Sequence, residues 1–409
     1  MNLSYSAEYE QFRAEVRGFL AEAWTAADVA SLPDPDSMAN MLGGGRPSER
    51  VTEFRKKAIE RGYLYRHVPR RYGGSEQAPD PLKATIIAEE FRRAKAPGEV
   101  VGQGPSMLVP TLLEHGTEAQ KEYFVRGTLL GHIRWCQGYS EPGAGSDLAS
   151  LRTRGVLDGD SFVVNGQKIW TSSAQDADWM FALIRTEPEQ PKHDGISYML
   201  IDMKTPGLDV RPLRQMTGDA DFNEVFFENV RVPVANLVGK RGQGWVVSRS
   251  TLKHERALIG GSHLTRRTFD GIVMLAQALE LRGKPAIKDP VVRNRLVELE
   301  ARLLANEYQG YRLLTMSARR EEPGLAAAVM KLASTSLGYD IAKLAMDVVG
   351  DRALLAPGEA NAPAMGMFGT AYMWSLGVLI AGGTANVQRN IIAERGLGLP
   401  RDAAASSKK

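Results

Sequence analysis

The chain has 409 residues, a net charge of +3 and 24% charged residues. This length is too great for one simple core and suggests two or three domains. The small net charge, with no dense basic run beside spaced aromatic residues, argues against a nucleic-acid-binding protein.

Cysteine, histidine and apolar content narrow the class of protein further. The single cysteine, Cys136, excludes an intrachain disulfide and fits a reducing cytoplasm. The six histidines are scattered, with no close pair at metal-ligand spacing. No run approaches the roughly 20 apolar residues that a membrane helix needs, and the start of the chain does not resemble a signal peptide. We therefore expect a cytoplasmic protein with no metal, no membrane contact and no nucleic-acid partner.

The first part of the chain, residues 1–131, has a helical pattern. Apolar residues recur at helical spacing near the start, and residues 82–93 predict another helix. Thr117 predicts the beginning of a third helix, because an acid follows it in the first turn. Residues 33–47, with three consecutive glycines, predict a loop.

The middle part, residues 132–242, has the pattern of short β-strands. Residues 180–184 and 225–232 are two of the expected strands. Asn165-Gly166 predicts a two-residue hairpin. Short strands separated by polar turns are typical of a small barrel or sandwich.

The last part, residues 243–409, is helical again. Its apolar periodicity and its prolines predict helices near 244–281, 289–319, 324–349 and 366–395. The order helical, β, helical predicts a mainly α protein with a central β domain.

Two neighbouring segments combine glycine, hydroxyl and aromatic residues. Residues 140–147 (SEPGAGSD) form a Gly- and Ser-rich turn, which exposes N–H groups and hydroxyls that can bond carbonyl or phosphate groups. Trp170, within residues 168–172 (KIWTS), could lie against a flat ring. Taken alone, each segment is better explained by an ordinary loop and a core tryptophan.

Together, these segments resemble the first signature of the acyl-CoA dehydrogenase family. Residues 382–390 (GGTANVQRN) resemble the second. Further family segments match residues 69–74, 87–90, 116–121 and 222–227, so the resemblance extends over essentially the whole chain. It implies the acyl-CoA dehydrogenase fold: an N-terminal helical domain (1–131), a central β-barrel or sandwich domain (132–242) and a C-terminal four-helix bundle (243–409).

The resemblance also implies a cofactor, FAD, and a set of residues around it. Residues at family positions that contact the cofactor are Gln137, Ser140, Trp170, Ser172, Gly383, Thr384 and Asn386. Ser146 matches a position on the CoA side, and the backbone N–H of Gly382 matches a donor to the thioester carbonyl. The implied reaction is the α,β-dehydrogenation of an acyl-CoA. A base removes the α proton, the cofactor takes the β hydride, and the electrons pass to an electron-transfer flavoprotein.

The position of the base departs from the commonest family pattern. Many members have a glutamate where this chain has Gly382, which cannot act as a base. A minority place it on the first helix of the C-terminal domain, where Glu255 stands. Leu252, Glu255 and Ile259 share one helix face, and desolvation on an apolar stripe raises a carboxyl pKa as a general base requires. The residues alone favour a structural ion pair for Glu255. The resemblance favours the base, with Arg256 either beside the substrate or in an ordinary salt bridge.

Residues that reach a neighbour's FAD in most homotetrameric members are also replaced. The expected Arg, Phe and Gln fall on Leu279, Arg282 and Pro290. Two assemblies stay open: a homo-oligomer (dimer or tetramer), or an α2β2 heterotetramer whose related subunits share each FAD site. The second occurs in bacterial steroid-degrading relatives, whose motifs this sequence resembles in style. That style favours a bulky or branched acyl group, such as a steroid side chain.

Two other functions on the same fold stay open. One is a non-catalytic subunit that completes a partner's FAD site. The other is a flavin monooxygenase or oxidase, which would react rapidly with oxygen once reduced. The presence of Glu255 and of residues 140–146 favours the catalytic dehydrogenase over the non-catalytic subunit.

Overall fold

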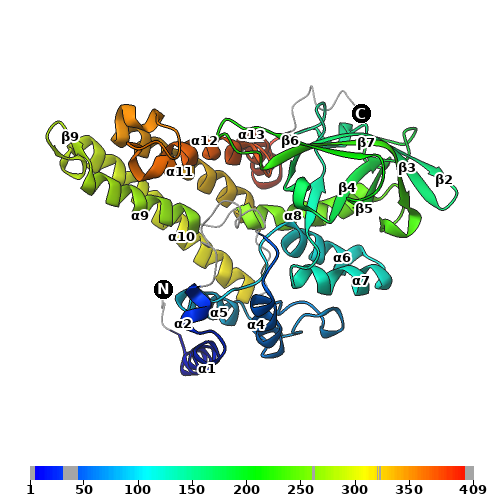
Figure 1. Cartoon of the computed structure of the whole chain (residues 1–409), viewed down its shortest axis with the longest axis horizontal. Helices are drawn as coiled ribbons and strands as arrows, with labels where there is room; N and C mark the ends of the chain where they lie inside the picture. Colours follow the sequence, from blue (N-terminus) through cyan, green and yellow to red (C-terminus); the bar gives the residue numbers. More distant parts are fainter. Residues whose placement is uncertain (1–4, 31–44, 260–262, 320, 322–323, 401–409) are drawn as a thin grey trace. The chain divides into compact units, whose positions relative to one another are not determined.

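The computed structural model describes residues 5–30, 45–259, 263–319, 321 and 324–400, without the side chains of residues 255–259 and 263–264 and a few others in the last third. The chain divides into two compact units (Figure 1). One comprises residues 1–215 and 219–254, and the other comprises residues 216–218 and 255–409. The loop expected over residues 33–47 lies largely outside the described residues.

The first unit begins with helices packed around one apolar core. These are α1 (Ala7–Ala23), α2 (Ala26–Ala30), α4 (Glu49–Glu60), α5 (Pro81–Arg93), α6 (Val109–His115) and α7 (Glu118–Leu129). Helix α7 begins as its sequence predicts. Thr117 accepts a bond from the Gln120 N–H through its Oγ1, and the Gln120 side chain accepts one from the Thr117 N–H.

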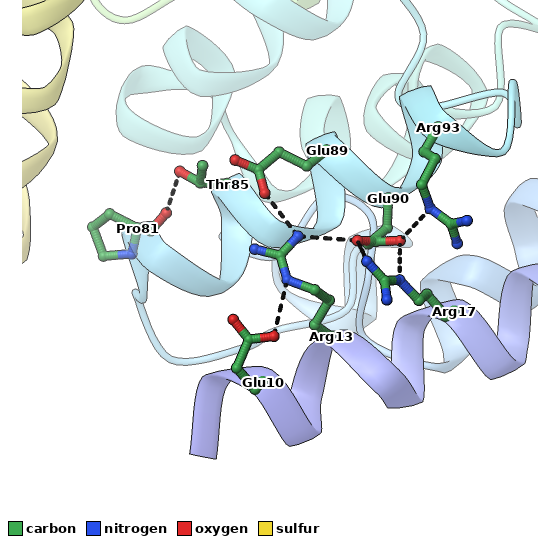
Figure 2. A network of polar contacts seen from close by, with 8 residues as sticks. All are labelled: Glu10, Arg13, Arg17, Pro81, Thr85, Glu89, Glu90 and Arg93. Atoms are coloured by element: carbon green, nitrogen blue, oxygen red, sulfur yellow. Dashed lines mark hydrogen bonds and ion pairs between the residues drawn. The ribbon is translucent and has the colours of Figure 1, made fainter. Parts of the chain in front are cut away.

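An ionic network around the buried Glu90 joins α1 to α5, and Figure 2 shows it from close by. The Glu90 carboxylate, only 2% exposed, accepts bonds from Arg13 (3.0 Å), Arg17 (2.8 and 3.0 Å) and Arg93 (2.8 Å). Arg13 also reaches Glu89 at 2.8 Å. Burial raises the pKa of Glu90, but the bonds from the arginines outweigh it and lower the pKa to about 2.

The first unit also contains one eight-stranded sheet and, after it, the larger part of the helix at Gly244–Ile259. The strands of the sheet run β6-β7-β3-β2-β4-β5-β8, with β1 parallel to β4. Their bounds are β1 (Trp135–Gly138), β2 (Arg154–Asp158), β3 (Ser161–Ser172), β4 (Trp179–Arg185), β5 (Ile196–Asp202), β6 (Leu208–Leu213), β7 (Phe222–Pro233) and β8 (Leu237–Val238).

The prediction of a hairpin at Asn165-Gly166 is wrong. Strand β3 continues through both residues, and the two-residue turn lies earlier, at Gly159 and Asp160 between β2 and β3. Asn165-Gly166 instead marks a shift in the register between β3 and β7. With the turn at Gly159 and Asp160, the first residues of β3, Ser161 to Asn165, pair with β2, and the whole strand pairs with β7.

The second unit is helical. Helix α8 (Gly244–Ile259) leads into it, and its members are α9 (His263–Ala278), α10 (Pro290–Ala318), α11 (Ala326–Val349), α12 (Met367–Ile380) and α13 (Ala385–Gly396). A small hairpin of β9 (Glu280–Leu281) and β10 (Lys284–Pro285) joins α9 to α10. Apolar side chains of α9, α10 and α11 form the core.

Two predicted helices are each divided in the structure. The helix expected over 244–281 is α8 and α9, with residues 260–262 outside the described part. The helix expected over 366–395 is α12 and α13, separated by residues 381–384. Gly382 and Gly383 have φ of +62° and +95° there, a region that favours glycine, and Thr384 then caps α13. No helix in the described ranges is long and apolar enough to cross a membrane.

Candidate functional site

A bulge near the end of strand β3 turns Trp170 out of the sheet. The register between β3 and β7 shifts between Lys168 and Thr171, and Trp170 within the shift has φ of +60°. A bulge re-aims a side chain, and positive φ is uncommon for a residue this large. The indole is 60% exposed and meets Phe222 edge to face, with centroids 6.1 Å apart. The sheet thus presents a flat aromatic surface with one supporting ring.

The segment of residues 140–147 lies beside this bulge. The Ile169 N–H donates to the Ser140 carbonyl at 2.9 Å, which brings Ser140 next to Trp170 although they are far apart in sequence. Ser140 and Ser172 are half-buried, as is Gln137 on β1. The structure therefore brings four predicted cofactor residues to one end of the sheet.

A buried ion pair fastens the segment to β3. Lys168 is 0% exposed, and its Nζ donates to Glu141 at 2.8 Å and to the Tyr139 carbonyl at 3.2 Å. Glu141 also accepts bonds from the N–H groups of Arg152 (2.6 Å) and Thr153 (2.9 Å). Burial lowers the pKa of Lys168 to about 8, although Glu141 opposes that shift. Sequence reasoning missed this pair, since a single lysine in a predicted strand gives no sign of burial.

The arrangement fits a flat, polar cofactor such as FAD. Two residues with hydroxyl groups are near the exposed indole: Ser172 is two positions later in β3, and the Ser140 backbone is bonded to the neighbouring Ile169. Two buried oxygens of the adjacent pair, Thr171 Oγ1 and Asn223 Oδ1, have no partner among the described residues. Ser146 lies exposed on the same segment.

Glu255, the expected base, follows the part of α8 that is hydrogen-bonded to α6 and its C-terminal end. Thr251 bonds Thr111 of α6 at 3.0 Å, and Ser250 bonds His115 at 2.9 Å. The backbone of Glu255 and Arg256 continues α8, but their side chains lie outside the described residues. The placement of the predicted base therefore rests on the helix alone.

In the second unit, the remaining predicted residues lie in the loop between α12 and α13 and at the start of α13. Gly382, Gly383 and Thr384 are half-buried and Asn386 is exposed. Thr384 Oγ1 accepts a bond from the Val387 N–H at 3.3 Å. Beneath the loop lies Lys331 of α11, a fully buried residue that sequence reasoning missed. Its signal is a single lysine in the otherwise apolar stretch AAAVMKLA.

Two other reactive side chains have ordinary surroundings. Cys136 is fully buried, and burial raises its thiol pKa, as for a small core residue. His254 is half-buried, and burial together with Lys253 lowers its pKa. No group of three or more His, Cys, Asp or Glu in the described ranges is arranged to hold a metal ion.

Comparison with known proteins places this geometry in a family. Models of the acyl-CoA dehydrogenase N-terminal, middle and C-terminal domains match residues 6–132, 136–230 and 242–397. The chain belongs to the acyl-CoA dehydrogenase family. The predicted family and its three-domain fold are confirmed, and so is the class of enzyme, an acyl-CoA dehydrogenase.

Similar proteins cover nearly the full length of the chain. Acyl-CoA dehydrogenase IpdE1 of Mycobacterium tuberculosis is 39% identical over 404 residues, 97% of this chain and 99% of its own length. A chain of the Tcur3481-Tcur3483 steroid ACAD matches with 30% identity and a TM-score of 0.77, covering 98% of this chain and 100% of its own. A chain of the ChsE4-ChsE5 complex from M. tuberculosis matches with 31% identity and a TM-score of 0.76, at the same coverage.

Proposed function

We propose that this acyl-CoA dehydrogenase binds FAD and oxidises a CoA thioester to the trans-2-enoyl-CoA. The observation that carries the proposal is the bulged end of β3, where Trp170 lies exposed beside Ser140 and Ser172. FAD, when bound, supplies the acceptor for the β hydride and hands the electrons to an electron-transfer flavoprotein. The chain's own residues hold the cofactor, orient the thioester and move the α proton.

The proposed cofactor contacts are the seven residues at family positions. They are Gln137, Ser140, Trp170, Ser172, Gly383, Thr384 and Asn386. Ser146 is the proposed contact on the CoA side. Replacing Trp170 by Ala should lower the FAD content of the purified protein, because the flat surface is lost. Tyr123→Ala removes another largely exposed aromatic ring of the same unit and should leave FAD content unchanged. Equal FAD content in both variants would contradict the proposed place of the cofactor.

Proton transfer is proposed to use Glu255 and the N–H of Gly382. The carboxylate of Glu255 takes the α proton, and the N–H bonds the thioester carbonyl, where negative charge develops. Arg256 is proposed to contact the substrate. We expect Glu255→Gln to keep FAD but slow flavin bleaching by an acyl-CoA about 10²- to 10⁴-fold. Glu359→Gln changes an exposed glutamate of the same unit and should bleach normally. Normal bleaching by Glu255→Gln would exclude it as the base.

The proposed substrate is a bulky, ring-bearing acyl-CoA of the steroid side-chain type. Support comes from the similar Tcur3481-Tcur3483 protein, which is described as a steroid ACAD. Turnover should be measured over a series of thioesters from short straight chains to steroid side chains. Turnover of short straight chains alone would contradict this proposal and leave the reaction class intact.

The assembly is proposed to be an α2β2 heterotetramer with a related acyl-CoA dehydrogenase chain. Two similar proteins, Tcur3481-Tcur3483 and ChsE4-ChsE5, are named as pairs of chains. An exposed apolar seam on α10 also supports a partner. It consists of Val297, Leu304, Tyr308 and Tyr311, spaced three to seven residues apart on one face, as in helix pairs.

Expressing this chain alone tests that assembly. Folded protein with little FAD supports the need for a partner, and about one FAD per chain in a homo-oligomer would contradict it. A variant with both Tyr308→Lys and Tyr311→Lys should fold normally, since both side chains are exposed, but should fail to assemble.

A further inference from the structure

The loop between α12 and α13 is held from beneath by two buried side chains. Lys331 Nζ donates to the carbonyl of Gly383 at 2.8 Å and to that of Leu379, in the last turn of α12, at 3.2 Å. Gln388 of α13 donates from Nε2 to the carbonyls of Gly382 at 3.1 Å and Gly383 at 3.4 Å. Side chains of two different helices thus fix two successive loop carbonyls.

A lysine is an unusual residue to find buried beneath a loop and bonded to backbone carbonyls. Lys331 is 0% exposed, and its two acceptors among the described residues are both backbone carbonyls. Burying an ammonium group is costly unless its hydrogen bonds are made. Its two acceptors are carbonyls, and one of them ends α12, where the helix dipole places partial negative charge. An apolar core alone would not require a lysine at this position.

The direction of the carbonyls determines the direction of the loop's N–H groups. In a trans peptide the N–H points opposite to the preceding C=O. With the carbonyls of Gly382 and Gly383 drawn toward Lys331 and Gln388, the N–H groups of Gly383 and Thr384 must point away from them. The N–H groups of Gly382, Gly383 and Thr384 have no partner among the described residues. Three successive unpaired N–H groups before the N-terminus of a helix form a strong site for negative charge.

We propose that Lys331, together with Gln388, is a positioning residue that orients the N–H groups of Gly383 and Thr384 toward the cofactor. By fixing the peptide that follows Gly382, the two side chains also restrain Gly382, whose N–H is the proposed donor to the thioester carbonyl. The inference rests on the proposed function, and it adds the groups that hold the catalytic loop. Neither side chain touches the substrate. Each acts through the backbone that it bonds.

The test compares three variants of the FAD-loaded protein. Lys331→Met removes both of the bonds that Lys331 makes, with little change in volume. Gln388→Met removes the other two and serves if Lys331→Met does not fold. Lys343→Met makes the same substitution at an exposed position of α11 and is the matched control.

The decisive readout is the acidity of a bound thioester that cannot be oxidised. A 3-thia-acyl-CoA loses its α proton at the site, and its enolate beside oxidised flavin absorbs at long wavelength. The pH dependence of this absorption measures how strongly the carbonyl is polarised. Lys331→Met should raise the apparent pKa of the bound analogue by about one unit or more, and should lower kcat about 10- to 100-fold per bound FAD with KM nearly unchanged. Gln388→Met should shift both quantities in the same direction by less.

A purely structural role gives a different result. Lys331→Met would then lower the melting temperature and FAD content, while the bound analogue would keep its wild-type pKa per FAD. That result would overturn the inference and leave the proposed function standing. A wild-type protein that binds FAD but gives neither turnover nor the long-wavelength absorption would overturn both. Any change in Lys343→Met as large as that in Lys331→Met would also overturn the inference.

Discussion

Two lysines, Lys168 of β3 and Lys331 of α11, are both fully buried, one in each unit of the molecule. Each lies under one of the two segments that carry the family signatures. Lys168 has a carboxylate partner, Glu141, and one carbonyl. Lys331 has two carbonyls. The same residue type is thus stabilised in two physically different ways.

The difference shows what each kind of partner can do. A carboxylate gives a strong contact, but its removal leaves an unpaired buried charge, so the Lys168 pair should behave as a structural clamp. Carbonyls give weaker contacts that fix the orientation of a backbone and bind no proton themselves. Burial lowers the pKa of Lys331, so its ammonium loses its proton at a lower pH than that of an exposed lysine. The Lys331 site should therefore affect the loop above it more than global stability.

The largest expected effect comes from breaking the Lys168 clamp. Lys168→Met leaves Glu141 buried with only N–H donors, and should cost about 3–5 kcal/mol of unfolding free energy. Urea unfolding measures it. The double variant Lys168→Met with Glu141→Gln removes the unpaired charge and should recover at least half of the loss. No recovery would mean that the packing of Lys168, rather than its charge, stabilises the segment.

Glu90 adds a third kind of buried charge to the comparison of the two lysines. It is an anion whose partners are the guanidinium groups of three arginines. Glu90→Gln removes charged acceptors from three arginines and should cost roughly 2 kcal/mol at neutral pH. The pKa of Glu90 lies near 2 in the fold against an ordinary 4.5, so its contribution is complete above pH 4.5 and is lost as the pH falls toward 2.

Urea unfolding at pH 6 and pH 3 checks both the size and the sign. The gap between wild type and Glu90→Gln should narrow at pH 3. Glu89→Gln, which removes a single contact from a 41% exposed side chain, should cost well under 1 kcal/mol. A gap that widens in acid would show that the network does not lower the pKa of Glu90.

Much of the fold could be predicted from local sequence signals. The predictions failed where two such signals competed. Thr117 has both the cap residue and the acidic first turn, and α7 begins after it. Asn165-Gly166 is an equally strong turn signal, yet the turn forms earlier in the chain, at Gly159 and Asp160. The break at Gly382 also had its signal, two glycines before a capping threonine, but the apolar pattern on both sides concealed it.

The site was less predictable, because its geometry depends on pairing between distant segments. The motif names Trp170, but its outward direction comes from a register shift against β7, which no single strand reveals. The acceptors of Lys331 lie 48 and 52 residues further along the chain. Sequence spacing could indicate that a lysine stood in an apolar helix, but not that its ammonium group bonded carbonyls of α12 and of the loop that follows it.

The smallest expected effect is that of a substitution in the loop itself. It tests the comparison most directly, because it leaves Lys331 unchanged. At Gly383, φ is +95°, and an added Cβ would lie 2.7 Å from Gln388 Nε2. Gly358 has a similar φ of +90° with nothing within 4 Å of an added Cβ. Each Gly→Ala change carries a backbone cost of about 1 kcal/mol. Only Gly383→Ala should also displace Gln388 and raise the apparent pKa of the bound 3-thia-acyl-CoA. If both variants lose the same stability and neither changes that pKa, the carbonyl contacts beneath the loop do not govern its N–H groups.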